Sequence, residues 1–91
     1  MSKLRVQWRT PRPPTLPADF ETQVFTQVCA LQPKRPGLSQ DETMIFETDA
    51  GGAVRLEYVF DHDFASQYDQ TERWGAMVRE GPRLEDWRGP F

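Results

Sequence analysis

His62 is the single histidine of the chain and Cys29 the single cysteine, so most side-chain chemistry would have to involve one of these two residues. The run Asp61-His62-Asp63 offers a general base or metal ligands. A zinc site usually takes three or four ligands with His or Cys prominent, and only Cys29 could add a soft ligand. We therefore expect a solvated acidic turn at a strand end, with no metal and no cofactor.

Other catalytic arrangements have little support in the residues. A Cys29-His62 nucleophilic pair is conceivable, but Cys29 lies on or beside an apolar stripe, where a small buried hydrophobe is the usual explanation. A serine triad would need the same histidine, without a nucleophile-elbow motif. Gly51-Gly52 fits a hairpin turn better than a phosphate loop. Paired carboxylates stay open, because acids are abundant, but their number alone discriminates nothing. The sequence favours a non-catalytic protein.

Charge is distributed unevenly along the chain. Residues 1–36 carry six Lys or Arg against two acids, whereas residues 37–91 carry five against twelve. The two parts therefore have net charges of +4 and −7, which sum to the −3 of the whole chain. An acidic surface repels nucleic acid and attracts basic protein surfaces. The N-terminal cations alternate with apolar residues as on the polar face of a strand, so direct nucleic-acid binding is not favoured.

A β-hairpin is the clearest element, with strands at 43–48 and 54–60 and a turn at 49–52. Apolar residues alternate along both strands, which is typical of strands with one buried face. A loop of three or five residues keeps the apolar side chains together, and in the shorter loop Gly51 would take the left-handed conformation. Two strands alone are marginal in water, so a larger sheet or a helix must cover them. The predicted inward residues are Met44, Phe46, Val54, Leu56, Tyr58 and Phe60.

The remaining segments are less distinct. Residues 3–9 alternate as a first or edge strand, and the Pro-rich residues 10–17 form an extended connector. Residues 18–32 read as helix or strand; the helix is favoured by a stripe of Phe20, Val24, Val28 and Leu31. Residues 70–79 also read as either, with strand slightly favoured. From Asp61 to Asp69 the chain becomes polar, and residues 82–91 form a tail that docks or frays.

Size and composition indicate one domain over residues 1–91. Hydrophobic residues make up 37% and charged residues 27%, which permits folding. The expected class is α+β, with a small antiparallel sheet around the hairpin and one or two helices. No apolar run would span a bilayer, the first residues lack a signal-like apolar region, and a lone cysteine suits a reducing compartment. We expect a cytoplasmic protein that does not associate with membranes.

Residues 43–81 resemble the C-terminal part of YezG-like immunity proteins. The resemblance rests on TMIFETDAGGAVRLEYVFDHDF at 43–64 and on Gln-Thr-Glu-Arg-Trp at 70–74. Those proteins are similar in pairing a hairpin with an acidic Tyr/Phe-Asp stretch, then Glu-Arg and a tryptophan. The resemblance implies a single-domain protein that neutralises a cognate toxin by binding it.

The sequence thus predicts a non-catalytic inhibitor or immunity protein that acts by occluding another protein. Acids just past the hairpin would steer a basic partner, and aromatic rings would pack at the contact. The alternatives are a phage-type inhibitor or DNA mimic aimed at a nucleic-acid enzyme, a small structural subunit of a larger assembly, and an enzyme. The candidate partner-binding residues are Asp61, Asp63, Tyr68, Asp69, Glu72 and Trp74.

Overall fold

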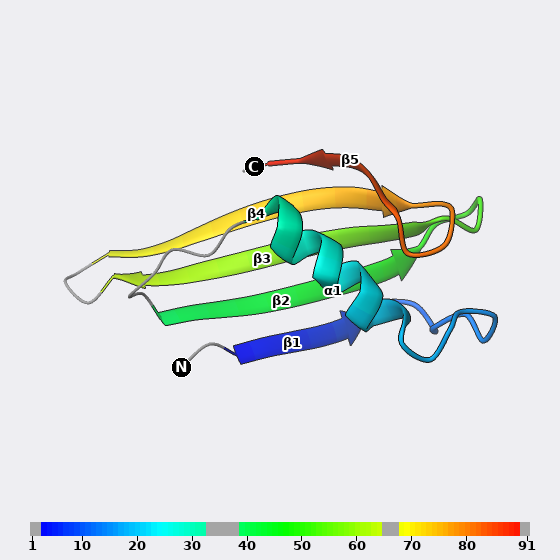
Figure 1. Cartoon of the computed structure of the whole chain (residues 1–91), viewed down its shortest axis with the longest axis horizontal. Helices are drawn as coiled ribbons and strands as arrows, with labels where there is room; N and C mark the ends of the chain where they lie inside the picture. The colour runs from blue at the N-terminus through cyan, green and yellow to red at the C-terminus, as the bar shows by residue number, and fades with distance from the viewer. Residues whose placement is uncertain (1–2, 33–38, 65–67, 90–91) are drawn as a thin grey trace.

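The structure, a computed structural model, describes the backbone of residues 3–32, 39–64 and 68–89, and the side chains of these residues except 3, 39–40, 62–64 and 68–70. One helix and five strands make up the described residues (Figure 1). In chain order they are β1 (Lys3–Trp8), α1 (Phe20–Leu31), β2 (Ser39–Thr48), β3 (Val54–Phe64), β4 (Tyr68–Val78) and β5 (Leu84–Arg88).

All five strands join in one sheet whose spatial order is the order of the chain. The β2–β3, β3–β4 and β4–β5 pairs are antiparallel, but β1 runs parallel to β2. The α+β class is therefore confirmed, while the predicted antiparallel sheet is matched in part: three of its four strand pairs are antiparallel and the pair of β1 with β2 is not. The reason is the helix between β1 and β2, which returns the chain to the end where β1 began, so that β2 repeats its direction.

The β2–β3 hairpin has the predicted faces and the five-residue loop that is one of the two predicted alternatives. Both of its strands are longer than predicted. Residues 49–53 form an odd-length connection, so Phe46 lies opposite Leu56 and Met44 opposite Tyr58. The left-handed residue is Gly52, with φ of 86°, and not Gly51 as predicted for a three-residue loop. The Asp49 carboxylate holds the turn by accepting hydrogen bonds of 2.9 Å from the amides of Gly51 and Ala53.

The solvated acidic turn expected at Asp61-His62-Asp63 is also wrong, because these residues belong to strand β3. β3 continues to Phe64 and β4 begins at Tyr68, with Asp61 opposite Thr71 and Asp63 opposite Asp69. Backbone pairing extends past Phe60 because each added pair satisfies ladder hydrogen bonds, whatever the polarity of the side chains.

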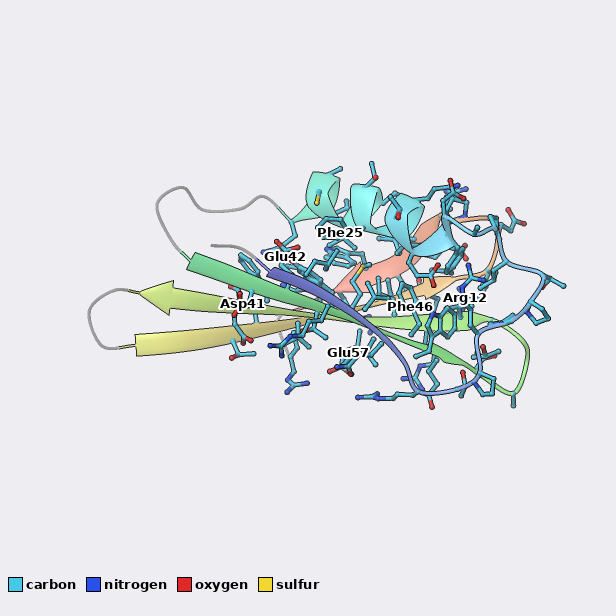
Figure 2. All side chains as sticks on the ribbon, turned by 90° about the horizontal axis from the view of Figure 1, so that it is seen from below. Arg12, Phe25, Asp41, Glu42, Phe46 and Glu57 are labelled. Atoms are coloured by element: carbon cyan, nitrogen blue, oxygen red, sulfur yellow. The ribbon has the colours of Figure 1, made fainter. Side chains whose placement is uncertain are left out.

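Residues 20–31 are helical, and the helix lies over one face of the sheet (Figure 2). Of the predicted stripe, Phe20, Val24 and Val28 are buried, whereas Leu31 at the end of α1 is 48% exposed. Packing against the sheet requires a 3.6-residue period, which outweighs the strand preference of the β-branched residues in this segment. Cys29 is exposed, so the buried hydrophobe expected there is wrong. The buried hydrophobic core is Phe20, Val24, Val28, Met44, Phe46, Val54, Leu56, Tyr58, Phe60, Ala76 and Val78.

The C-terminal residues dock on β4 as strand β5. Trp87 stacks on Trp74 with ring centroids 5.3 Å apart, and the Gln27 side chain of α1 accepts a 2.9 Å hydrogen bond from the Leu84 amide. This packing leaves no room for a side chain at Gly89, because a Cβ there would lie 2.5 Å from the Arg73 carbonyl oxygen. The described part of the tail is therefore an integral strand.

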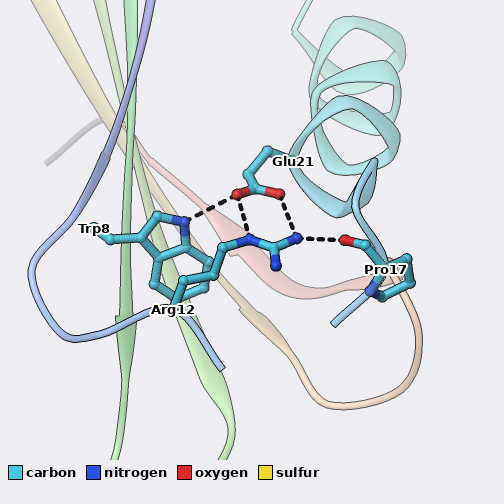
Figure 3. A network of polar contacts seen from close by, with 4 residues as sticks. All are labelled: Trp8, Arg12, Pro17 and Glu21. Carbon is cyan, nitrogen blue, oxygen red and sulfur yellow. Dashed lines mark hydrogen bonds and ion pairs between the residues drawn. The ribbon is translucent and has the colours of Figure 1, made fainter. Parts of the chain in front are cut away.

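A polar clasp ties the Pro-rich connector to the start of α1 (Figure 3). The Arg12 guanidinium donates to both oxygens of Glu21, at 2.8 and 3.1 Å, and also to the Pro17 carbonyl. The Trp8 indole donates to the same carboxylate at 3.1 Å. Three segments, namely β1, the connector and α1, thus converge on one carboxylate.

Candidate functional site

The described elements leave the face of the sheet away from α1 uncovered (Figure 2). We call it the open face, and Asp41 and Glu57 mark it in Figure 2, opposite the side that carries α1. Its residues alternate along each strand with those of the core and are exposed or half-buried. The open face includes Arg9, Asp41, Ile45, Arg55, Glu57, Val59, Asp61, Thr71, Arg73, Gly75 and Met77.

Half-buried aliphatic residues occupy the middle of the open face, and charged residues surround them. Ile45, Val59 and Met77 come from three successive strands. Between them the Glu57 carboxylate pairs with Arg73 at 2.6 Å and with Arg9 at 3.4 Å. Such exposed pairs contribute at most about 1 kcal/mol to stability. An apolar middle with an arginine-containing rim is the composition found in protein-binding surfaces.

A hollow opens on this face where β4 lacks a side chain at Gly75. In the sheet register Gly75 lies opposite Glu57 of β3 and Arg88 of β5, and the β4–β5 ladder shifts between Gly75 and Met77. A shift of this kind bends the strand and interrupts the regular surface. The hollow has a volume of about 400 Å³ and is lined by Arg55, Leu56, Glu57, Gly75, Ala76, Met77, Asp86 and Arg88.

One end of the open face is acidic. Asp41 of β2 and Asp61 of β3 lie directly opposite each other, and both are exposed. The Thr71 hydroxyl donates a 2.7 Å hydrogen bond to Asp61. Like charges directly across a ladder cost about 0.2–1 kcal/mol, so this pairing does not serve the fold. The sequence analysis missed Asp41 because it began this strand at residue 43. In the structure β2 begins at Ser39 and therefore includes Asp41.

The predicted partner-binding residues do not form one surface. Asp61 lies on the open face, whereas Glu72 and Trp74 have the parity of the core and lie on the helix side. Glu72 accepts a 3.4 Å hydrogen bond from Gln32, and Trp74 packs inside the domain against Trp87.

The other three candidates are placed by their backbone only. Asp63 pairs with Asp69 across β3 and β4, and Tyr68 pairs with Phe64. Their side chains, like that of His62, lie outside the described residues. Register puts Asp63 and Asp69 two residues beyond the Asp61–Thr71 pair, at the same end of the sheet.

Glu42 is a second residue that the sequence analysis missed. It is 2% exposed, on the helix side of β2, in line with Met44 and Phe46. The predicted alternation of buried residues, extended by two residues from Met44 toward the N-terminus, would have placed Glu42 on the buried face. Burial, and next the Glu42 carboxylate, raise the pKa of Tyr58, so that the phenol stays protonated at neutral pH.

Among the described side chains there is no group of three or more His, Cys, Asp or Glu that could hold a metal ion. Over the same described residues, α1 is too short and too polar to cross a membrane. Comparison with known proteins finds no family model, no curated protein and no solved structure that matches the chain.

Proposed function

We propose that this protein is a non-catalytic protein-binding module that inhibits its partner by covering it, in the manner of an immunity protein or another small inhibitor. The observation that supports this proposal is the open face, an uncovered five-stranded surface with aliphatic residues in its middle and charges around them. A rigid sheet can cover a partner's working surface without ordering flexible segments, so binding costs little conformational entropy.

Charge on the open face would orient the partner. The acidic end, with Asp41 and Asp61 exposed and Asp63 and Asp69 paired beyond them, would attract a basic patch and raise the association rate. Contact energy would come mainly from burial of the aliphatic middle and from the arginines; arginine and methionine are enriched at protein interfaces, and arginine also at binding hot spots.

Affinity capture from the native cell tests this function. The purified chain serves as bait, alongside an Ile45→Glu, Val59→Glu double variant of the open face and an Ala30→Glu variant of the exposed surface of α1. We expect a stoichiometric protein partner with the unmodified bait and the α1 variant, and loss of that partner with the open-face variant. Circular dichroism of each bait verifies folding. A partner that binds all three baits equally would contradict binding through the open face.

The purified partner then tests the occlusion mechanism and its electrostatic part. Addition of the protein should abolish the partner's activity at equimolar concentration. Reversing the charge of Asp41 and Asp61 to Lys should slow association by about tenfold at low salt and leave dissociation nearly unchanged. Association that is insensitive to both charge reversal and ionic strength would remove the steering role of the acidic end.

A further inference from the structure

The two acids and two arginines that line the Gly75 hollow differ in their partners. Glu57 is already paired with Arg9 and Arg73, and Asp86 with Arg79 at 3.4 Å. Arg55 and Arg88, in contrast, have no hydrogen bond or ion pair to any residue that the structure describes. The two carboxylates of the hollow are thus paired with arginines that do not line it. The exposed guanidinium groups of Arg55 and Arg88, which do line it, remain available.

The backbone places these two arginines on either side of the hollow. Arg55 comes from β3 and Arg88 from β5, and β4 with Gly75 runs between them. Asp86, on the rim, has φ of 56°, a left-handed conformation that is uncommon for a residue other than glycine. Strained backbone persists only where the surroundings enforce it, and it gathers at ligand-binding positions. Here Asp86 lies on β5 beside the register shift between Gly75 and Met77 of β4.

We propose that the Gly75 hollow is a subsite for a carboxylate side chain of a protein partner, held between Arg55 and Arg88. The planar guanidinium group binds a carboxylate through two parallel hydrogen bonds, which are charge-assisted and among the stronger hydrogen bonds in proteins. Met77 at the edge of the hollow would contact the methylenes of a Glu side chain. This inference rests on the proposed function and adds the chemistry of one contact to it.

Charge complementarity over the whole face favours a protein partner over nucleic acid. Asp41 and Asp61 lie on the same open face, with Asp61 six residues along β3 from Arg55, and would repel a polyanion that extended along the face from the hollow. A protein surface with an acidic side chain next to a basic patch would match both ends of the open face. The expected partner therefore presents an Asp or Glu to the hollow and Lys or Arg to the acidic end.

Arginine side-chain NMR tests the subsite without the natural partner. An acetylated, amidated hexaglutamate peptide is titrated into ¹⁵N-labelled protein, and the Nε–Hε signals of Arg55, Arg88 and Arg83 are followed. We expect saturable shifts of Arg55 and Arg88, whereas Arg83, an exposed arginine in the β4–β5 loop, should not change. Inorganic phosphate and a single-stranded DNA of matched charge are titrated in parallel. Equal or tighter binding of either would overturn the assignment to a carboxylate of a protein.

Substitutions then separate the subsite from general charge. Arg55→Ala and Arg88→Ala should each weaken peptide binding by about tenfold or more, and Arg83→Ala should not. Gly75→Val should abolish binding by filling the hollow, in a strand that accommodates β-branched residues. Thermal unfolding verifies that the variants fold; if Gly75→Val does not, the arginine variants decide. Unchanged binding in both arginine variants would contradict the proposal.

The same variants distinguish failure of this inference from failure of the proposed function. If the Arg55→Ala, Arg88→Ala double variant still captures the partner fully while the Ile45→Glu, Val59→Glu variant does not, the open-face function stands and the carboxylate subsite falls. Loss of the partner in both supports both.

Discussion

At the scale of single residues, the two adjacent glycines of the β2–β3 connection differ in what they require. Gly52 has a φ of 86° and open space around its Cα, so its constraint is conformational. Gly51 has no positive φ, and a Cβ there would meet the Asp49 carboxylate at 3.5 Å, an ordinary contact distance. Only Gly52 therefore needs to be glycine, because a side chain disfavours the left-handed region.

We predict that Gly52→Ala destabilises the protein by about 1–2 kcal/mol and that Gly51→Ala changes stability by about 0.5 kcal/mol or less. Urea unfolding of the two variants measures both values, and Gly51→Ala is the matched control. The opposite order would mean that Gly51 occupies the left-handed position, as in a three-residue loop.

At the scale of elements, the clasp between the connector and α1 links stability to pH. The hydrogen bonds from Arg12, as the main cause, lower the pKa of Glu21 from its ordinary value of 4.5. Because the folded state has the lower pKa, the carboxylate stabilises the fold above the ordinary pKa. That contribution is lost as pH falls from the ordinary value through the lowered one.

We predict that Glu21→Gln destabilises the protein at neutral pH and that the difference from the unmodified protein shrinks as pH drops below about 4. Urea unfolding over a pH series measures this convergence. Glu80→Gln, at an exposed carboxyl in the β4–β5 loop, is the control and should change stability little at any pH. A constant difference across the series would show that Glu21 contributes packing and not charge.

At the scale of the whole molecule, one core connects all the described elements. The buried residues come from α1, β2, β3 and β4, and Trp8 of β1 and Trp87 of β5 pack against them from the two edges of the sheet. Among the described elements, α1 forms one layer and the sheet the other, and there is no second core that could remain folded by itself.

We predict a single cooperative unfolding transition. The three tryptophans lie on β1, β4 and β5, so their fluorescence reports both edges of the sheet, while far-UV circular dichroism reports the backbone. The two thermal midpoints should coincide. An earlier fluorescence transition, assigned with single-tryptophan variants to Trp8 or Trp87, would show that an edge strand detaches first.

Local periodicity in the sequence was sufficient for the faces of the hairpin, the strand at β1 and the helical stripe of Phe20, Val24 and Val28. Side chains two residues apart on a strand, or three to four apart on a helix, share a face whatever the rest of the molecule does. The extended connector predicted from the prolines is only partly matched, because a turn closes within it, with the Leu16 amide donating to the Pro13 carbonyl at 3.3 Å. The direction of β1, the left-handed Gly52 and the strand pairing beyond Phe60 required the tertiary structure.

The candidate site shows the same division. The sequence identified Asp61 and the acidic region around it, because charge is visible in composition. It did not identify Asp41, the open face or the Gly75 hollow, which arise where strands distant in sequence come together. Whether an arginine has a partner depends on which strand lies beside it, and strand neighbours are decided by packing of the whole sheet and not by local sequence.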